Sequence, residues 1–279
     1  MATKLAAITG ASSGFGLLTT VELARQGFEV VATLRDLGRR SHLDKAAEAA
    51  GVSQRIDVQQ LDVTEFDRIP SFMADVLRKH GRIDVLVNNA GFAVAGFVED
   101  LKLEEIRLQF ETNFFGAVAM TKAVLPAMRA QKSGHIIMVS SVGGLHASPI
   151  LSSYSASKHA LEGWTESLRL EVNSLGIKVA LIEPGAFATD IWTRNAKLGE
   201  KVFDSASPNF ERGRRMQEHV NKMPKRDATE VARLIVRVAQ DPNPRLRYLI
   251  GTDAHVQVWL KRLLPWKWQE KIVARAVGL

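Results

Sequence analysis

The sequence contains no cysteine among its 279 residues. This absence excludes disulfide bonds, thiolate nucleophiles, iron–sulfur clusters and cysteine-ligated zinc sites, and it suits a reducing compartment. The seven histidines form no HExxH-like pair, and no pair of acidic residues adjoins them, so we expect no metal cofactor. Tyrosine is also scarce, with two in the whole chain, which makes each tyrosine position informative.

Long apolar runs are missing as well. No uninterrupted stretch approaches the ~20 residues that a membrane-spanning helix needs. The first ten residues lack the apolar core and the cleavage site of a signal peptide. With 46% hydrophobic and 24% charged residues, the composition is that of an ordinary globular protein, and we expect it to be cytoplasmic.

The net charge of +7 comes entirely from the last quarter of the chain. Residues 211–279 hold 15 Lys or Arg against 7 Asp or Glu, whereas residues 1–210 hold 22 against 23. A nucleic-acid-binding module would interleave basic and aromatic residues over a groove or a recognition helix. Residues 1–210 show no such module, so we expect no nucleic-acid partner.

Short apolar runs alternate with longer helical stretches, which is typical of an α/β fold. Most of the runs are continuously apolar, as expected for parallel strands covered on both faces. We predict strands at Leu5–Thr9, Glu29–Leu34, Ile56–Leu61, Asp84–Val87, His135–Val139, Lys178–Ile182 and Tyr248–Ile250. We predict helices at Leu17–Gln26, Phe66–His80, Leu101–Arg129 (shortened or kinked by Pro126), Ser155–Leu175 and Ala228–Gln240. The expected architecture is one doubly wound (Rossmann) parallel sheet of about seven strands, over residues 1–254.

Two segments interrupt this alternation. Residues 187–225 show no clear period, and so long an insertion at the carboxyl edge of a parallel sheet is expected to be a lid or a binding loop. Residues 255–279 form a basic amphipathic appendage, interrupted by Pro265, with three of the five tryptophans. One helical face of the appendage collects Val256, Trp259, Leu260, Leu263 and Leu264. It packs on its own domain or a sister subunit, lies on an anionic membrane surface, or folds over the active site.

A glycine-rich turn follows the first predicted strand and opens a helix. Thr9–Gly16 reads TGASSGFG, that is G-x-x-x-G-x-G. Glycines let a backbone turn tightly against a pyrophosphate, and a helix amino end offers free N–H groups and a positive dipole. A plain strand–helix turn is the alternative.

Further motifs in the same order make the sequence resemble the short-chain dehydrogenase/reductase family. They are NNAG at Asn88–Gly91, the helix asparagine Asn113, Ser141 thirteen residues before Tyr154, YxxxK at Tyr154–Lys158, and PGxxxT at Pro184–Thr189. The resemblance implies the fold predicted above and a nicotinamide cofactor. It implies cofactor contacts from Gly10, Ser12, Ser13, Gly14, Phe15, Gly16, Arg35, Asp62, Val63, Asn89, Ala90, Gly91, Tyr154, Lys158, Pro184, Gly185 and Thr189.

The predicted catalytic residues are Asn113, Ser141, Tyr154 and Lys158. Tyr154 and Lys158 are four residues apart, so a helix places them on one face, where an ammonium would bring the tyrosine pKa down toward the working range. Ser141 would hold the substrate oxygen beside Tyr154, with Ser140 as an alternative. By resemblance, Asn113 orders a water that relays protons through Lys158; bracing a helix kink is a compatible role.

The end of the second strand predicts the cofactor. An acid there would bind the ribose of NAD, but the sequence has Leu34 and then Arg35, whose guanidinium pairs with a 2′-phosphate. NADP(H) is therefore preferred over NAD(H). Asp36 lies one place too late for the ribose, and a two-residue shift of the alignment would reverse the choice. Asp62 is either an adenine contact or a helix cap.

The resemblance implies a substrate pocket lined by Phe92, Leu145, His146, Phe187 and Trp192, each of which is otherwise a core residue. This mostly uncharged lining indicates a hydrophobic alcohol or ketone as substrate. The longer tail and the Arg35-type cofactor site resemble relatives that act on steroids, retinoids and other lipophilic substrates. We predict an NADP(H)-dependent oxidoreductase that interconverts a secondary alcohol and a carbonyl. A 3-ketoacyl or 3-ketosphingoid reductase, a non-catalytic NADPH sensor and a membrane-surface scaffold are the alternatives. Family members commonly pair through the helices matching 101–129 and 155–175, so a homodimer or homotetramer is expected.

Overall fold

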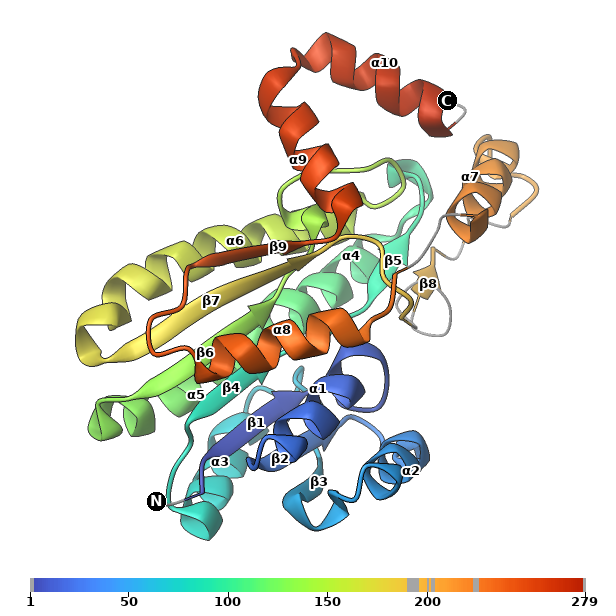
Figure 1. The fold of residues 1–279 in the computed structure, drawn as a ribbon. Helices are drawn as coiled ribbons and strands as arrows, with labels where there is room; N and C mark the ends of the chain where they lie inside the picture. The colour runs from blue at the N-terminus through green and yellow to red at the C-terminus, as the bar shows by residue number, and fades with distance from the viewer. Residues whose placement is uncertain (1–2, 190–195, 200, 202–203, 223–225, 278–279) are drawn as a thin grey trace.

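A seven-stranded parallel sheet forms the centre of the molecule (Figure 1). The computed structural model describes residues 3–189, 196–199, 201, 204–222 and 226–277. The strand order is β3-β2-β1-β4-β6-β7-β9. The strands all run in parallel, but their order along the chain reverses beside β1. The strands are β1 (Leu5–Thr9), β2 (Glu29–Leu34), β3 (Ile56–Gln60), β4 (Val85–Asn88), β6 (Gly134–Val139), β7 (Ile177–Pro184) and β9 (Arg247–Ile250). The predicted doubly wound fold is confirmed.

Helices cover both faces of this sheet and bury two hydrophobic cores against it. One face carries α1 (Gly14–Arg25), α2 (Ser41–Ala49) and α8 (Thr229–Gln240). The other carries α3 (Arg68–His80), α5 (Gly116–Gln131) and α6 (Ser152–Val172). Because the strands are covered on both sides, their residues are apolar throughout, which is why continuous runs predicted them.

The stretch predicted as one helix over 101–129 is three consecutive elements. They are α4 (Leu103–Phe110), a π-helical turn η4 (Glu111–Phe115) and α5. Pro126 lies inside α5 without ending it, because α5 continues to Gln131. The expected shortening at Pro126 is therefore wrong, and the interruption lies at the π turn instead.

The carboxyl ends of the strands carry the remaining elements. Short strands β5 (Ala93–Ala95) and β8 (Ala196–Leu198) pair in parallel, and α7 (Phe210–Lys222) lies within the segment expected to lack a period. In Figure 1, α9 (Thr252–Leu263) rises from the end of β9, and α10 (Trp266–Val277) runs from it toward α7, which it contacts. None of the described helices combines the length and apolarity needed to cross a membrane.

Candidate active site

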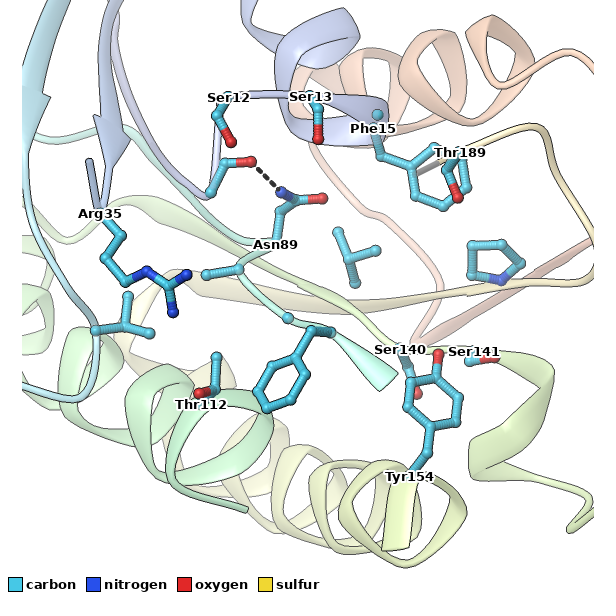
Figure 2. Close-up of a pocket in the computed structure, with 18 of the residues that line it drawn as sticks. Ser12, Ser13, Phe15, Arg35, Asn89, Thr112, Ser140, Ser141, Tyr154 and Thr189 are labelled. Atoms are coloured by element: carbon cyan, nitrogen blue, oxygen red, sulfur yellow. Dashed lines mark hydrogen bonds between the residues drawn. The ribbon is translucent and has the colours of Figure 1, made fainter. Parts of the chain in front are cut away.

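One pocket lies at the carboxyl ends of the strands, between the turns that follow β1, β2, β3, β4, β6 and β7 (Figure 2). Parallel sheets place their ligand sites at this edge, where the strand order reverses. Most of the predicted cofactor residues line it: Gly10, Ser12, Ser13, Gly14, Phe15, Arg35, Asp62, Val63, Asn89, Ala90, Gly91, Tyr154, Lys158, Pro184, Gly185 and Thr189. Gly16 is the predicted cofactor residue that does not.

The glycine turn after β1 is closed by neighbouring backbone. Gly10 has φ +71°, and a Cβ there would lie 2.8 Å from Ala90 Cα. A Cβ on Gly16 would lie 2.2 Å from the Gly10 oxygen, so Gly16 supports the turn from behind. Asn89 Nδ2 donates to the carbonyls of Thr9 at 2.8 Å and Gly10 at 3.1 Å. These contacts hold a turn free of bulky side chains at the amino end of α1, as a pyrophosphate cradle requires.

The turn after β2 presents two arginines to the pocket. Leu34 ends the strand as a buried residue, and Arg35 follows it at the pocket wall. Asp36 also lines the pocket, but its Oδ1 accepts a hydrogen bond from the backbone N–H of Gly38 at 2.8 Å. Arg39 was not predicted; it ends the short helix η1 (Leu37–Arg39) and lines the same wall. The donors at this wall suit an anionic phosphate.

The turn after β3 contributes Asp62 and Val63 to the pocket. Asp62 Oδ1 accepts hydrogen bonds from Thr64, at 3.0 Å from its backbone N–H and 2.8 Å from its hydroxyl. Asp62 is thus a turn-capping residue that also faces the site. The helix-cap alternative is wrong, because the N-cap of α3 is Asp67, and the adenine contact stays a prediction.

Tyr154 and Lys158 project from α6 toward the end of β6, and both are buried. Lys158 Nζ donates to the Val139 carbonyl at 2.8 Å and lies 5.9 Å from the centre of the Tyr154 ring. Tyr154 forms a hydrogen bond with Ser141, and Figure 2 shows its hydroxyl directed toward Ser140 and Ser141. Three predicted catalytic side chains therefore meet at one end of the pocket.

Burial dominates the ionisation of this pair. It raises the pKa of Tyr154 to about 12, and the hydrogen bond from Ser141 opposes that rise. Burial likewise lowers the pKa of Lys158 to about 8, opposed by the negative charge of Glu162. The sequence predicted that Lys158 would lower the pKa of Tyr154, but the largest effect on that pKa is the rise caused by burial. Tyr154 therefore holds its proton at neutral pH.

The two serines after β6 have different partners. Ser141 Oγ accepts from the Gly143 N–H at 3.0 Å and begins the short helix η5 (Val142–Gly144). A Cβ on Gly143 would lie 3.0 Å from the Tyr154 ring, so the turn packs closely on that ring. Ser140 lines the pocket too, but its hydroxyl donates to Glu162. The arrangement favours Ser141 over Ser140 as the partner of Tyr154.

Asn113 lies in η4 and is buried outside the pocket lining. Its Oδ1 accepts from the Phe92 N–H at 3.1 Å, and its Nδ2 donates to the Phe92 carbonyl at 3.0 Å and to Ser157 Oγ at 3.3 Å. The side chain thus joins the turn after β4 to α6. This bracing is the role that was considered compatible with a proton relay.

Two of the predicted substrate residues line the pocket, Phe92 and Phe187. Phe187 is also fully buried and packs edge-on against Phe15, with ring centroids 5.9 Å apart. Leu145 and His146 do not line the pocket. Their loop turns toward α9, where Lys261 Nζ donates to the Leu145 carbonyl.

Two predicted substrate residues remain, His146 and Trp192. His146 is half-buried, and burial lowers its pKa, as do the charges of Lys261 and His159. Trp192 lies outside the described residues. Unpredicted lining residues are Leu61, Leu108, Thr112 and Val139. Leu108 and Thr112 are one helical turn apart on α4 and η4, a spacing that could have identified them once the site was known.

The sequence is similar to known oxidoreductases over most of its length. The model of the short chain dehydrogenase family matches residues 4–198. An uncharacterized oxidoreductase of Bacillus subtilis is 42% identical over 275 residues, covering 98% of each chain. Bovine retinol dehydrogenase 8 is 37% identical over 274 residues, covering 92% of this chain and 85% of its own. A 3-ketodihydrosphingosine reductase of Bacteroides thetaiotaomicron is 42% identical over 200 residues, covering 72% and 70%.

Solved structures agree in fold. A short-chain dehydrogenase from Streptomyces avermitilis matches with a TM-score of 0.82 and 33% identity over 98% of both chains. ElxO with bound NADP matches at 0.76 and 25% identity, covering 91% of this chain and 100% of its own. A Burkholderia phymatum relative with NAD matches at 0.79 and 26% identity, covering 94% and 93%. The chain, with its glycine turn and its tyrosine–lysine pair at one sheet edge, belongs to the short-chain dehydrogenase family of oxidoreductases.

Proposed function

We propose that this protein is an NADP(H)-dependent oxidoreductase that interconverts a secondary alcohol and a ketone or aldehyde on a lipophilic substrate. The observation that carries the proposal is that Ser141, Tyr154 and Lys158 meet in the same pocket as the glycine turn. A bound nicotinamide supplies or accepts the hydride. Tyr154, protonated at neutral pH, gives its proton to the carbonyl oxygen in the reductive direction.

The other residues prepare this proton transfer. Ser141 orients the substrate oxygen beside the Tyr154 hydroxyl. The Lys158 ammonium holds the nicotinamide ribose and stabilises the phenolate that remains after Tyr154 has given up its proton. Asn113 braces the turn after β4 and orders the relay that returns a proton. Phe92, Leu108 and Phe187 are apolar residues of the pocket lining, which suits a lipophilic substrate.

NADP(H) is favoured by the wall after β2. Leu34 stands where an NAD-binding acid is expected, Arg35 follows it at the pocket wall, and Arg39 adds a second cation there. Asp36 directs one carboxylate oxygen at the Gly38 backbone rather than leaving it for a ribose hydroxyl. Because a charged pair at such a wall contributes about 1.5–3 kcal/mol, its loss corresponds to roughly 10- to 100-fold in affinity.

The test combines cofactor binding with turnover. Fluorescence titration is expected to give tighter binding of NADPH than of NADH, and Arg35→Ala to weaken NADPH by roughly 10- to 100-fold with little effect on NADH. Arg40→Ala is the matched control, since Arg40 pairs with Asp44 at 2.8 Å and does not line the pocket. Oxidation of NADPH by lipophilic ketones and aldehydes in the same cuvette is then expected.

The outcomes separate the alternatives. An equal loss of NADPH and NADH affinity in Arg35→Ala would contradict the cofactor assignment. Turnover restricted to long-chain 3-keto substrates would favour a 3-ketoacyl or 3-ketosphingoid reductase, an alternative that the identity to the Bacteroides enzyme favours. Tight NADPH binding without turnover of any substrate would favour an NADPH sensor.

We also propose that the C-terminal helices lie on an anionic lipid surface. In α9, Val256, Trp259 and Leu263 form one exposed stripe, and in α10 Trp268 and Ile272 form another. Trp259 is 61% and Trp268 64% exposed. Exposed cations accompany them: Lys261, Arg262, Lys267, Lys271 and Arg275. Tryptophan and basic residues together suit a phospholipid interface, whereas a second copy would place like charges together. The homodimer or homotetramer expected to form through the helices matching 101–129 and 155–175 stays a prediction.

Vesicle sedimentation tests this surface. The full-length protein is expected to pellet with vesicles containing phosphatidylserine and to remain in the supernatant with phosphatidylcholine alone. Trp259→Ser/Trp268→Ser should reduce the bound fraction severalfold, because apolar area buried at the interface supplies part of the affinity. Leu170→Ser is the control, since Leu170 is 84% exposed on α6. Equal binding by both variants, or none by the unaltered protein, would contradict the proposal.

A further inference from the structure

A buried ionic cluster lies directly behind the catalytic end of the pocket. We call Ser140, Glu162, Glu183 and Arg247 the Glu162 cluster. Ser140 Oγ donates to one oxygen of Glu162, and Arg247 Nη1 donates to the other and, at 2.5 Å, to Glu183. Glu162 is 4% and Glu183 1% exposed, so both carboxyl groups are removed from water. Buried charges of this kind are retained only with partners of good geometry.

The cluster joins α6, which carries Tyr154 and Lys158, to the ends of the neighbouring strands. Glu162 comes from α6, Ser140 from the end of β6, Glu183 from β7 and Arg247 from β9. The turn η5 is pressed onto it as well, since a Cβ on Gly144 would lie 2.9 Å from both Ser140 Oγ and Glu162 Cγ. Displacing Glu162 would therefore loosen the turn that positions Ser141.

Glu162 also lies one helical turn beyond Lys158 on the same side of α6. Lys158 Nζ is bound to the Val139 carbonyl, and the next residue, Ser140, is bound to Glu162. Burial lowers the pKa of Lys158 to about 8, and the negative charge of Glu162 raises it. The carboxylate thus supports the ammonium form of a lysine that has lost its water.

We infer that Glu162, fixed by Ser140 and Arg247, is a positioning residue that keeps Lys158 charged and in place behind Tyr154. The inference rests on the oxidoreductase function proposed above. The charged and titratable groups that face Glu162 are Lys158 from its own helix, Glu183 from β7 and Arg247 from β9; Ser140 is uncharged. Glu166 binds Arg247 from the solvent side at 2.5 Å.

The neighbouring carboxyl Glu183 has a pKa raised to about 7 by burial and by the charge of Glu162. Glu183 therefore holds a proton for part of the time at neutral pH. If Glu162 lost its charge, Glu183 would ionise more readily and partly replace it. A variant at Glu162 must therefore be compared with one in which Glu183 is also neutral.

The experiment measures kcat/KM for carbonyl reduction against pH. Glu162→Gln keeps the shape but removes the charge, so the pKa of Lys158 should fall and the alkaline limb should move to lower pH by ~1 unit. The double variant Glu162→Gln/Glu183→Gln should move the alkaline limb further. Glu162→Asp keeps the charge, so its alkaline limb should lie close to that of the unaltered protein. Glu166→Gln is the matched control, because it removes a carboxylate from the same arginine at the solvent-exposed end.

A second readout does not need turnover. NADPH affinity is titrated by fluorescence over the same pH range. As the pH rises, it should begin to fall at a lower pH in Glu162→Gln than in the unaltered protein, because Lys158 would hold the ribose only while charged. Failure of every carbonyl substrate would therefore defeat the proposed function without deciding this inference. Melting temperatures with and without NADPH show that each variant is folded.

Two results would overturn the inference. One is an alkaline limb that stays in place in Glu162→Gln and in the double variant, while kcat alone falls. The other is an equal shift in Glu162→Gln and Glu166→Gln. The first would show that Glu162 only serves the packing of α6 on the sheet, and the second that the effect of its charge on Lys158 is not specific to its place in the cluster.

Discussion

Tyr154→Phe is expected to lower kcat for carbonyl reduction by roughly 10²- to 10⁴-fold, the usual contribution of a positioned proton donor. The ring is buried in α6 beside η5, and phenylalanine keeps its shape while removing the hydroxyl that meets Ser141. NADPH affinity should stay nearly unchanged. Steady-state kinetics and fluorescence titration on the same preparation measure the two quantities.

The chain provides its own control. Tyr248 is the other tyrosine, and its hydroxyl accepts from the Arg245 N–H at 2.9 Å, away from the pocket lining. Tyr248→Phe should therefore leave kcat close to that of the unaltered protein. A kcat in Tyr154→Phe as high as that of the unaltered protein would show that Tyr154 is not the proton donor.

The largest expected effect on stability is at Gly176. This residue ends the short helix η6 (Asn173–Leu175) with φ +80°, and a Cβ there would lie 2.3 Å from the Lys132 carbonyl oxygen. The positive φ alone costs an L-residue about 1–2 kcal/mol. The collision with backbone should add roughly 1–3 kcal/mol in Gly176→Ala, since the chain before β6 must shift.

Gly27→Ala separates the two contributions. Gly27 has φ +87°, yet a Cβ there would meet nothing within 4 Å. Urea unfolding should therefore give a modest loss of unfolding free energy for Gly27→Ala and a clearly larger loss for Gly176→Ala. Equal losses would mean that the close approach of Gly176 to Lys132 does not constrain the fold.

The strands were predictable because of how they are buried. β1 and β2 begin and end at the predicted residues, and the other five lie within two residues of the prediction. Parallel strands covered on both sides need apolar residues at every position, so the pattern is visible without knowledge of partners. The family motifs were equally visible, because they are local in sequence.

Features made by distant partners could not be predicted. The π turn around Asn113 depends on hydrogen bonds to Phe92 and Ser157, which are 21 and 44 residues away. Glu162 and Arg247 are 85 residues apart, and each alone resembles an ordinary surface charge. Helix α2 (Ser41–Ala49) was also absent from the prediction.

The attachment of α9 has a thermodynamic consequence. Asp253 accepts a hydrogen bond from the Ala186 N–H at 2.7 Å, just after the pocket residue Gly185, and Lys261 binds the Leu145 carbonyl near η5. Helix α9 therefore connects the C-terminal helices directly to two turns that border the reactive centre. By linkage, a surface that tightened substrate binding by some factor would itself be held more tightly by the substrate-loaded protein, by that same factor.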